Sequence, residues 1–230
     1  MATVVRNPAA VAGLPESFAT LADFRDWIHS TDRQKGSRAT YVNGGFEIDM
    51  SPERISGHND IKTRMTTVLD SICEAEQRGV VFSDGVLLVN EDADLGCEPD
   101  MMFCSIETLR HGRATRRAWK CDSEGDVELH GTPDMVAEIV SNSSARKDTV
   151  DLRQAYFTAG IAEYWLVDGR GDEIEFDLLV RGEHSYTSIA ADPEGYRYSP
   201  VFQRSFRFAR EAHPVLGLRC RLLVRTEVTP

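Results

Sequence analysis

The sequence predicts a mixed α/β domain in which helices flank a central β-sheet. The apolar run from Met135 to Val140 is short and partly β-branched, and it lies between Pro133 and a Ser/Asn cluster. Such a run is typical of a strand buried on both faces of a sheet. Apolar residues between Ile61 and Ile72 recur at helical spacing and predict an amphipathic helix. Most patterns after this strand and the helix that follows it indicate short strands, so we expect a β-rich C-terminal part.

Length and composition favour one domain in a soluble protein. The 230 residues suffice for one well-packed core, and we predict a flexible N-terminal arm over residues 1–16, a domain over 17–212 and a C-terminal tail over 213–230. The net charge of −11 argues against a protein that coats nucleic acid, although one local basic face could still meet it. We expect no membrane span and no secretion signal. Five cysteines without a C-x-x-C motif favour free thiols and a cytoplasmic location.

The N-terminal half alternates between helix and strand patterns. A first helix is expected after Ser17, and the Asn43-Gly44-Gly45 turn predicts a hairpin in which Glu47 and Asp49 face away from the apolar residues. Gly79 is placed to end the helix that begins near residue 61. The other elements expected in this half are a strand or hairpin over Val80–Asn90 that bends at Asp84-Gly85, and a short strand over Pro99–Cys104.

The C-terminal half begins with a polar excursion over residues 106–131. After the apolar run, a helix is expected from Ala145 to Ala159, because serines precede it and Gly160 can end it. The remaining predicted strands are Ala162–Asp168, Glu173–Val180, Ser185–Ile189 and one around Phe206–Phe208. No element is predicted for the basic and apolar segment from Leu216 to Val224.

Two acidic residues stand in or beside apolar strands. Glu138 interrupts the run at 135–140, where an ionised carboxylate costs several kcal/mol, in order of magnitude, unless a metal or a hydrogen-bonded cation compensates it. A plainer interpretation places Glu138 at the end of the strand, pointing to solvent. Asp100 follows Pro99 at the start of another apolar strand. If the two strands are neighbours, both carboxylates can hold one hard divalent cation.

Oxygen ligands of this kind suit Mg²⁺ or Mn²⁺. The backbone carbonyl of Ile139 could add a third ligand. Such a cation can generate hydroxide and stabilise charge on a phosphoryl oxygen. Asp134 is expected to position the entry to the strand rather than to bind metal. His58 is a candidate for the same cleft, although a capping or surface role is equally consistent with its place in the first helical turn.

The arrangement of Pro99-Asp100 and Glu138-Ile139-Val140 resembles the motif of the PD-(D/E)XK nuclease superfamily. Three longer segments are similar to a large bacterial family of restriction-endonuclease-like proteins long classed as a domain of unknown function. They occur in the family's order from the first helix to about Phe208, and they are residues 45–52, residues 133–141, and Asp148 with residues 156–168. The Glu-Tyr-Trp-Leu-Val-Asp block at 163–168 is the most specific of them.

The resemblance implies a restriction-endonuclease-like α/β/α sandwich around a central mixed β-sheet. It also implies Mg²⁺-dependent hydrolysis of DNA phosphodiester bonds. Carried over by position, Asp100 and Glu138 would be metal ligands. Glu47 or Asp49, together with the helix that holds His58, would line the same cleft.

The chain departs from the superfamily pattern at its lysine. The motif lysine would fall at Val140, and the position on the following helix that often carries it in this family is Leu152. Arg153 and Lys147 are therefore the candidates for a displaced cation. Arginine can donate hydrogen bonds to phosphate but cannot act as a general base. One helical turn holds 3.6 residues, so Arg153 points about 100° away from Leu152.

Alternatives remain open at this stage. The chain could be a nuclease-fold protein without catalytic activity that binds nucleic acid or acts as a dimeric regulatory module. A basic run around Trp119 could follow a DNA backbone, or it could be a solvated surface. Tyr164 and Trp165 belong either to the core or to a subunit interface, so a homodimer is plausible. The residues of the basic run are Arg110, Arg113, Arg116, Arg117 and Lys120.

Overall fold

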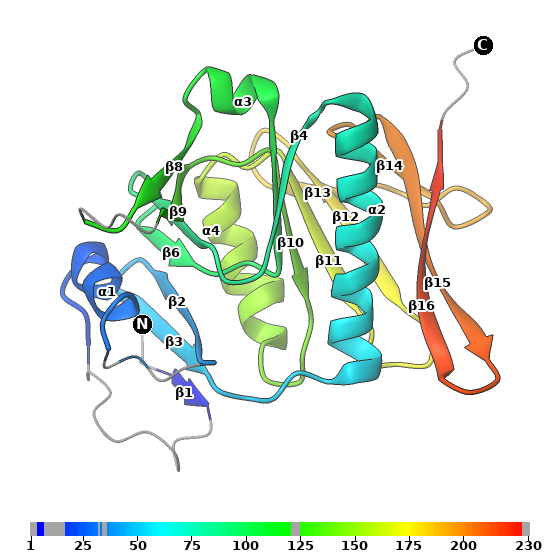
Figure 1. Cartoon of the computed structure of the whole chain (residues 1–230), viewed down its shortest axis with the longest axis horizontal. Coiled ribbons are helices and arrows are strands. Elements are labelled where there is room, and N and C mark those ends of the chain that lie inside the picture. Colours follow the sequence, from blue (N-terminus) through cyan, green and yellow to red (C-terminus); the bar gives the residue numbers. More distant parts are fainter. Residues whose placement is uncertain (1–3, 7–16, 32, 34–35, 121–124, 227–230) are drawn as a thin grey trace.

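The computed structural model describes residues 4–6, 17–31, 33, 36–120 and 125–226 (Figure 1). A six-stranded sheet forms the centre, in the order β13-β12-β11-β10-β7-β4. Only β10 and β11 in it are parallel, which makes the sheet mixed. Its strands are β4 (Gly79–Ser83), β7 (Met101–Ser105), β10 (Met135–Ile139), β11 (Glu163–Asp168), β12 (Glu175–Arg181) and β13 (Tyr186–Ser188).

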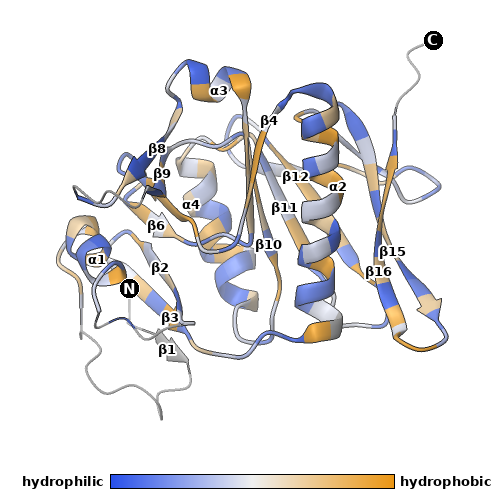
Figure 2. Ribbon diagram, viewed as in Figure 1, coloured by the Kyte–Doolittle hydropathy of each residue, from blue (hydrophilic) through white to orange (hydrophobic). Residues whose placement is uncertain are grey.

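Helices cover both faces of this sheet, which confirms the predicted fold class. Side chains alternate across β10, so Met135 and Ala137 pack towards α2 (Asp60–Glu76) while Val136 packs towards α4 (Leu152–Thr158). A π-helical turn precedes each helix and continues into it: η2 (Ile55–Asn59) before α2, and η3 (Lys147–Asp151) before α4. Figure 2 shows the apolar residues concentrated on these central strands.

A seven-stranded sheet lies beyond α4, in the order β1-β3-β2-β6-β5-β9-β8. Helix α1 (Leu21–Ile28) packs on it through an aromatic cluster around Phe24. A capping box between Thr20 and Asp23 begins α1. The strands are β1 (Val4–Arg6), β2 (Arg38–Val42), β3 (Gly45–Asp49), β5 (Leu87–Asn90), β6 (Leu95–Cys97), β8 (Ala114–Ala118) and β9 (Asp126–Gly131).

Two expectations about these strands need correction. The segment Val80–Asn90 is not a hairpin, because β4 and β5 belong to different sheets and the bend at Asp84-Gly85 carries the chain between them. The excursion over 106–131 is not merely polar surface, because it contributes α3 (Ile106–Arg110) and strands β8 and β9. These elements were not predicted because the segment is polar; β8, for example, is a largely exposed edge strand.

A third sheet forms the C-terminal part and packs against α2. It consists of β14 (Arg197–Ser199), β15 (Arg204–His213) and β16 (Gly217–Arg225). The segment expected to be a tail therefore contains β16, which pairs with β15 along its whole length. The N-terminal arm expected over residues 1–16 lies outside the described residues except for Val4–Arg6, which pair with β3.

Tyr164 and Trp165 settle one open alternative. Both side chains are completely buried inside a single chain, so they belong to the core and offer no surface to a second subunit. The hairpin expected around Asn43-Gly44 is present as β2 and β3, with Asn43 and Gly44 in the left-handed conformation that this turn requires. No helix among the described residues is long and apolar enough to cross a membrane.

Candidate active site

The two predicted carboxylates come from neighbouring strands. Asp100 immediately precedes β7, Glu138 lies in β10, and these strands pair so that Met101 faces Ala137. Each acid is only 4% exposed. The backbone N–H of Ile139 donates to Asp100 Oδ2 at 2.8 Å, which fixes the aspartate against the end of β10. The alternative in which Glu138 points to solvent is therefore wrong.

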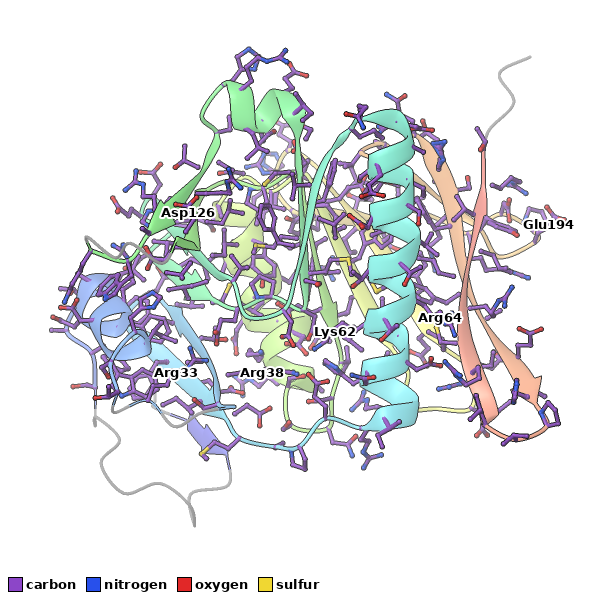
Figure 3. All side chains as sticks on the ribbon, in the orientation of Figure 1. Arg33, Arg38, Lys62, Arg64, Asp126 and Glu194 are labelled. Atoms are coloured by element: carbon purple, nitrogen blue, oxygen red, sulfur yellow. The ribbon has the colours of Figure 1, made fainter. Side chains whose placement is uncertain are left out.

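Cationic side chains surround Asp100. His58 Nε2 lies 3.1 Å from Asp100 Oδ2, while Lys62 Nζ lies 3.4 Å and Arg38 Nη1 3.7 Å from Oδ1. Arg38 lies in β2 and Lys62 in α2, and Figure 3 labels both side chains. Glu53 bridges the group, because it forms ion pairs with both Lys62 and Arg38. Although burial raises it, the His58 hydrogen bond and these positive charges hold the pKa of Asp100 well below its usual range.

Glu138 has the opposite electrostatic environment. Burial, together with the negative charges of Asp148 and Asp100, raises its pKa to about 8, although Lys147 opposes the shift. The phenol of Tyr156 on α4 donates to Glu138 Oε1 at 2.5 Å. Glu138 is therefore largely protonated at neutral pH unless additional positive charge comes close to it.

Lys147 interacts electrostatically with all three buried acids, Asp148, Glu138 and Asp100. It lies at the start of η3, with its Nζ 3.4 Å from Asp148 Oδ1. Burial lowers the pKa of Lys147, but the negative charges of Asp148, Glu138 and Asp100 raise it by a larger amount, so the net shift is upward. The ammonium group therefore stays protonated. Asp148 Oδ2 accepts a hydrogen bond from Ser144, whereas the buried Oδ1 has no hydrogen-bond partner among the described residues.

The acids of β3 approach the same region from the seven-stranded sheet. Asp49 accepts hydrogen bonds from Ser143 Oγ at 2.7 Å and from the Ser51 N–H at 2.8 Å. Burial raises its pKa, but these bonds and the charge of Lys147 produce a net decrease. Glu47 contributes to the raised pKa of Lys147 and so also lies within electrostatic reach of it.

Arg153 is not brought to this site. Its Nη2 donates to the carbonyl of Tyr186, 3.1 Å away, because the helical rotation between positions 152 and 153 turns it towards β13. The expectation that Arg153 meets the substrate near Glu138 is therefore wrong in geometry. Leu152 is completely buried in the core, and Val140 lies at the wall of the cleft described below.

Several residues of the site escaped the sequence analysis: Arg38, Glu53, Lys62 and Tyr156. A usable signal existed for Lys62, which stands four positions after His58 and so shares its helical face. Asp134 behaves as expected, since it accepts hydrogen bonds from Ser105 N–H and Thr108 Oγ1 at the entry to β10.

The basic run around Trp119 forms contacts of its own. Arg113, Arg116 and Lys120 pair with Asp134, Asp126 and Asp26 respectively. Trp119 stacks on His29 at a centroid distance of 4.5 Å. None of these recorded contacts involves Asp100 or Glu138.

A cleft of about 590 Å³ opens near the two acids, although neither Asp100 nor Glu138 itself lines it. It runs between η2, the loop after β10, the loop after β11 and the turn of the β15–β16 hairpin. Arg38 and His58 belong both to its wall and to the surroundings of Asp100. Its other charged residues are Asp49, Glu53, Arg54, Arg170 and Arg210.

The donor chemistry of the site fits a hard divalent cation. Within the described part of the chain, no three His, Cys, Asp or Glu side chains converge as metal ligands. Mg²⁺ does not require such a set, because one or two carboxylates usually hold it and water completes the octahedron. Besides burial, the closeness of the acids Asp100, Glu138 and Asp148 raises the pKa of Glu138 and of Asp148, and a bound cation would relieve this repulsion.

The fold and the buried acids together define a protein of the nuclease class. Residues 21–211 match the model of the Uma2 family, described as "Putative restriction endonuclease", and the chain belongs to this family. In fold it is similar to the crystal structure of "a putative nuclease belonging to DUF820" from Anabaena variabilis, with a TM-score of 0.57 and 16% identity. The likeness covers 80% of this chain and 90% of that chain. No protein with a curated description matches significantly.

Proposed function

We propose that the protein is a Mg²⁺- or Mn²⁺-dependent nuclease that hydrolyses DNA phosphodiester bonds with an activated water molecule. The observation that carries the proposal is that two buried acids, Asp100 and Glu138, interact with the partly buried Lys147 near an open cleft. Family membership supports the same chemistry. Buried ionisable groups with strongly shifted pKa values are typical of functional sites.

Asp100, Glu138 and the carbonyl of Ile139 are the groups that would hold the cation, and Asp49 and Glu47, which both interact electrostatically with Lys147, would orient its bound waters. A divalent cation would supply a water of lowered pKa and neutralise charge that develops on the phosphoryl oxygens. Its positive charge would lower the pKa of Glu138, which burial and the neighbouring acids raise, and so favour the ionised carboxylate.

Lys147 serves the substrate as a hydrogen-bond donor. Because the surrounding acids keep it protonated, it cannot accept a proton from water, but it can orient the water and donate to a phosphoryl oxygen. It replaces the motif lysine that is missing at Val140. His58 and Arg38 stand between Asp100 and the cleft, where they can contact the phosphate that follows or precedes the bond to be cut.

One observation favours a second function, that of a catalytically silent nucleic-acid-binding or dimeric regulatory module. Arg38, His58 and Lys62 already compensate the charge of Asp100, so the site is stable without a metal. In this case the arginine-lined cleft would bind an anionic partner without cutting it.

The two functions differ in a metal titration followed by thermal melting. If the protein is a nuclease, Mg²⁺ or Mn²⁺ should raise its melting temperature, because a bound ion stabilises the folded state by RT ln(1 + [L]/Kd). The rise should disappear in Asp100→Asn and Glu138→Gln. Asp134→Asn is the control, because Asp134 also lies at the entry to a strand but is outside the site. A plasmid-cleavage assay with the same variants then tests turnover. A wild-type protein without any metal-dependent rise or cleavage would refute the nuclease proposal.

A further inference from the structure

The β15–β16 hairpin is fastened along α2 at both of its ends. In the first turn of α2, Asp60 accepts hydrogen bonds from the Cys220 N–H at 2.6 Å and from Arg219 Nη2 at 2.7 Å. At the last residue of α2, Glu76 forms an ion pair with Arg204. The hairpin therefore lies as a fixed arm beside the helix, and its turn projects next to the start of α2 (Figure 1).

The turn of this arm, residues 213–218, presents apolar side chains to solvent. Val215 is 83% exposed, and Leu216 and Leu218 are also exposed. The backbone N–H groups of Val215 and Leu216 donate to His213 Nδ1 at 3.2 and 3.1 Å, so the turn holds its shape without burying these side chains. We call residues 213–218 the hairpin tip. It lies beyond residue 211, where the match to the family ends.

The hairpin tip forms one wall of the cleft beside the acids. Leu216 and Leu218 line this cleft together with Pro52 and Val140. The cleft also has four arginines and one histidine against two acids, in a chain of net charge −11. Arg38 pairs with Glu53 and Arg170 with Asp168, whereas Arg54 and Arg210 form no ion pair among the described residues. Local positive charge in an acidic protein favours a polyanionic ligand at this place.

Arg210 connects the arm to the loop after β11. Its Nη2 donates to the carbonyls of Gly169 and Gly171, at 2.7 and 3.1 Å, while its buried Nε has no hydrogen-bond partner among the described residues. The loop after β11 and the arm are thus held at a fixed separation. A volume of about 590 Å³ is in the range of small-ligand pockets. Apolar side chains in such a cleft can meet the face of a base only where the base is not stacked in a duplex.

We infer that the cleft takes a DNA strand with unpaired bases, whose base faces contact Leu216 and Leu218 while Arg54 contacts its phosphates. This inference rests on the proposed nuclease function and names its substrate class. Apolar side chains that project from a rigid element are used by other DNA-binding proteins to contact or separate bases. Phosphate contacts then fix the register of the strand on the protein, which leads it to Asp100 and Glu138.

Fluorescence anisotropy in EDTA tests this inference without cleavage. The probes are a labelled single-stranded oligonucleotide and the duplex of the same sequence. Leu216→Ser with Leu218→Ser should weaken single-strand binding about 5- to 20-fold, since the apolar surface that the bases would bury is lost, and should change duplex binding little. The control is Ile106→Ser, an equally simple change of an exposed apolar residue on α3, which should leave both affinities unchanged. Arg54→Ala should lower the salt dependence of binding by about one unit.

The outcomes separate the two proposals. The inference is overturned if the duplex binds as tightly as the single strand, or if a tip variant binds the single strand as well as wild type does. Cleavage that depends on Glu138 would still support the nuclease in either case. A tip variant that loses only self-association in size-exclusion chromatography shows that the tip binds a second copy, and it also overturns the inference. Absence of binding to either probe, together with absence of cleavage, overturns both.

Discussion

Tyr156 donates a hydrogen bond of 2.5 Å to Oε1 of Glu138, and this contact joins α4 to the acid at the centre of β10. The phenol is itself completely buried and lies 3.5 Å from Cys97 Sγ. A proposed metal ligand is thus positioned by a residue of another layer. The position of the carboxylate depends on the docking of α4 against the sheet.

Tyr156→Phe should lower the free energy of unfolding by about 1–3 kcal/mol, because it leaves a buried carboxyl oxygen without this donor. Urea denaturation measures this change. Tyr186→Phe is the matched control, because Tyr186 also donates a buried hydrogen bond, to the Ile161 carbonyl at 2.8 Å, away from Glu138. Both variants should lose similar stability, but only Tyr156→Phe should weaken Mn²⁺ binding. Equal metal affinities in the two variants would contradict a positioning role for Tyr156.

The raised pKa of Glu138 makes stability depend on pH. The carboxyl titrates near 4.5 in the unfolded chain and at about 8 in the folded protein, so between these values the folded state binds more protons. The free energy of unfolding therefore falls as pH rises from 4.5 to 8, by up to about 1.4 kcal/mol per pH unit from this group. Melting curves of wild type and Glu138→Gln in EDTA measure the effect. The decline should be smaller in the variant, and parallel pH profiles would argue against a buried neutral acid.

Lys147→Gln should reduce DNA cleavage by about 100-fold or more, as expected for the loss of a charged donor to the transition state. Cleavage of a labelled oligonucleotide in Mn²⁺ measures the rate. Because removing the charge also leaves buried acids uncompensated, Lys147→Arg provides a second variant that keeps the charge and should retain more activity. Arg153→Gln is the control, since Arg153 points towards Tyr186. Equal losses in Lys147→Gln and Arg153→Gln would exclude the assigned role.

Glu128→Gln should lower the free energy of unfolding by about 3 kcal/mol at neutral pH, because a buried carboxylate then no longer pairs with Arg25, whose Nη2 is 2.7 Å away. Although burial raises it, hydrogen bonds from His29, Arg25 and His130 lower the pKa of Glu128. Its stabilising contribution is therefore present above the ordinary value of 4.5 and is lost as pH falls below it.

Denaturation of wild type and Glu128→Gln at pH 7 and pH 4 measures this contribution. The difference between the two proteins should shrink at the lower pH. Glu107→Gln, a change at a highly exposed acid, should have no effect at either pH. A difference that stays constant with pH would show that Glu128 acts through packing alone.

Local pattern was enough to predict the elements whose sequence periodicity matches their burial. The helix around Ile61–Ile72 and the strands at 101–105, 135–139 and 163–168 were all expected, because helical spacing marks the buried face of the helix and short apolar runs mark the buried strands. Strands β8 and β16 were missed, since exposed basic side chains interrupt their apolar pattern and their stability depends on pairing with β9 and β15.

Asp100, Glu138 and Lys147 were recognisable in the sequence because a charge inside or beside an apolar strand needs a partner, and because the surrounding segments resemble a known family. The identity of those partners was not recognisable. Arg38 is 62 positions from Asp100 along the chain, and Tyr156 is 18 positions from Glu138. Such pairs become neighbours only when the two sheets and α4 dock.

The sequence by itself determined that two acids would be placed in or beside the central strands, and it offered Arg153 and Lys147 as candidates for a displaced cation. The tertiary structure alone decided which of the two lies with the acids, because the helix turns Lys147 to Asp148 and Arg153 to β13. It also decided that the C-terminal hairpin forms one wall of the cleft. The pairing of Asp60 with Arg219 and Cys220 joins segments that no local pattern relates.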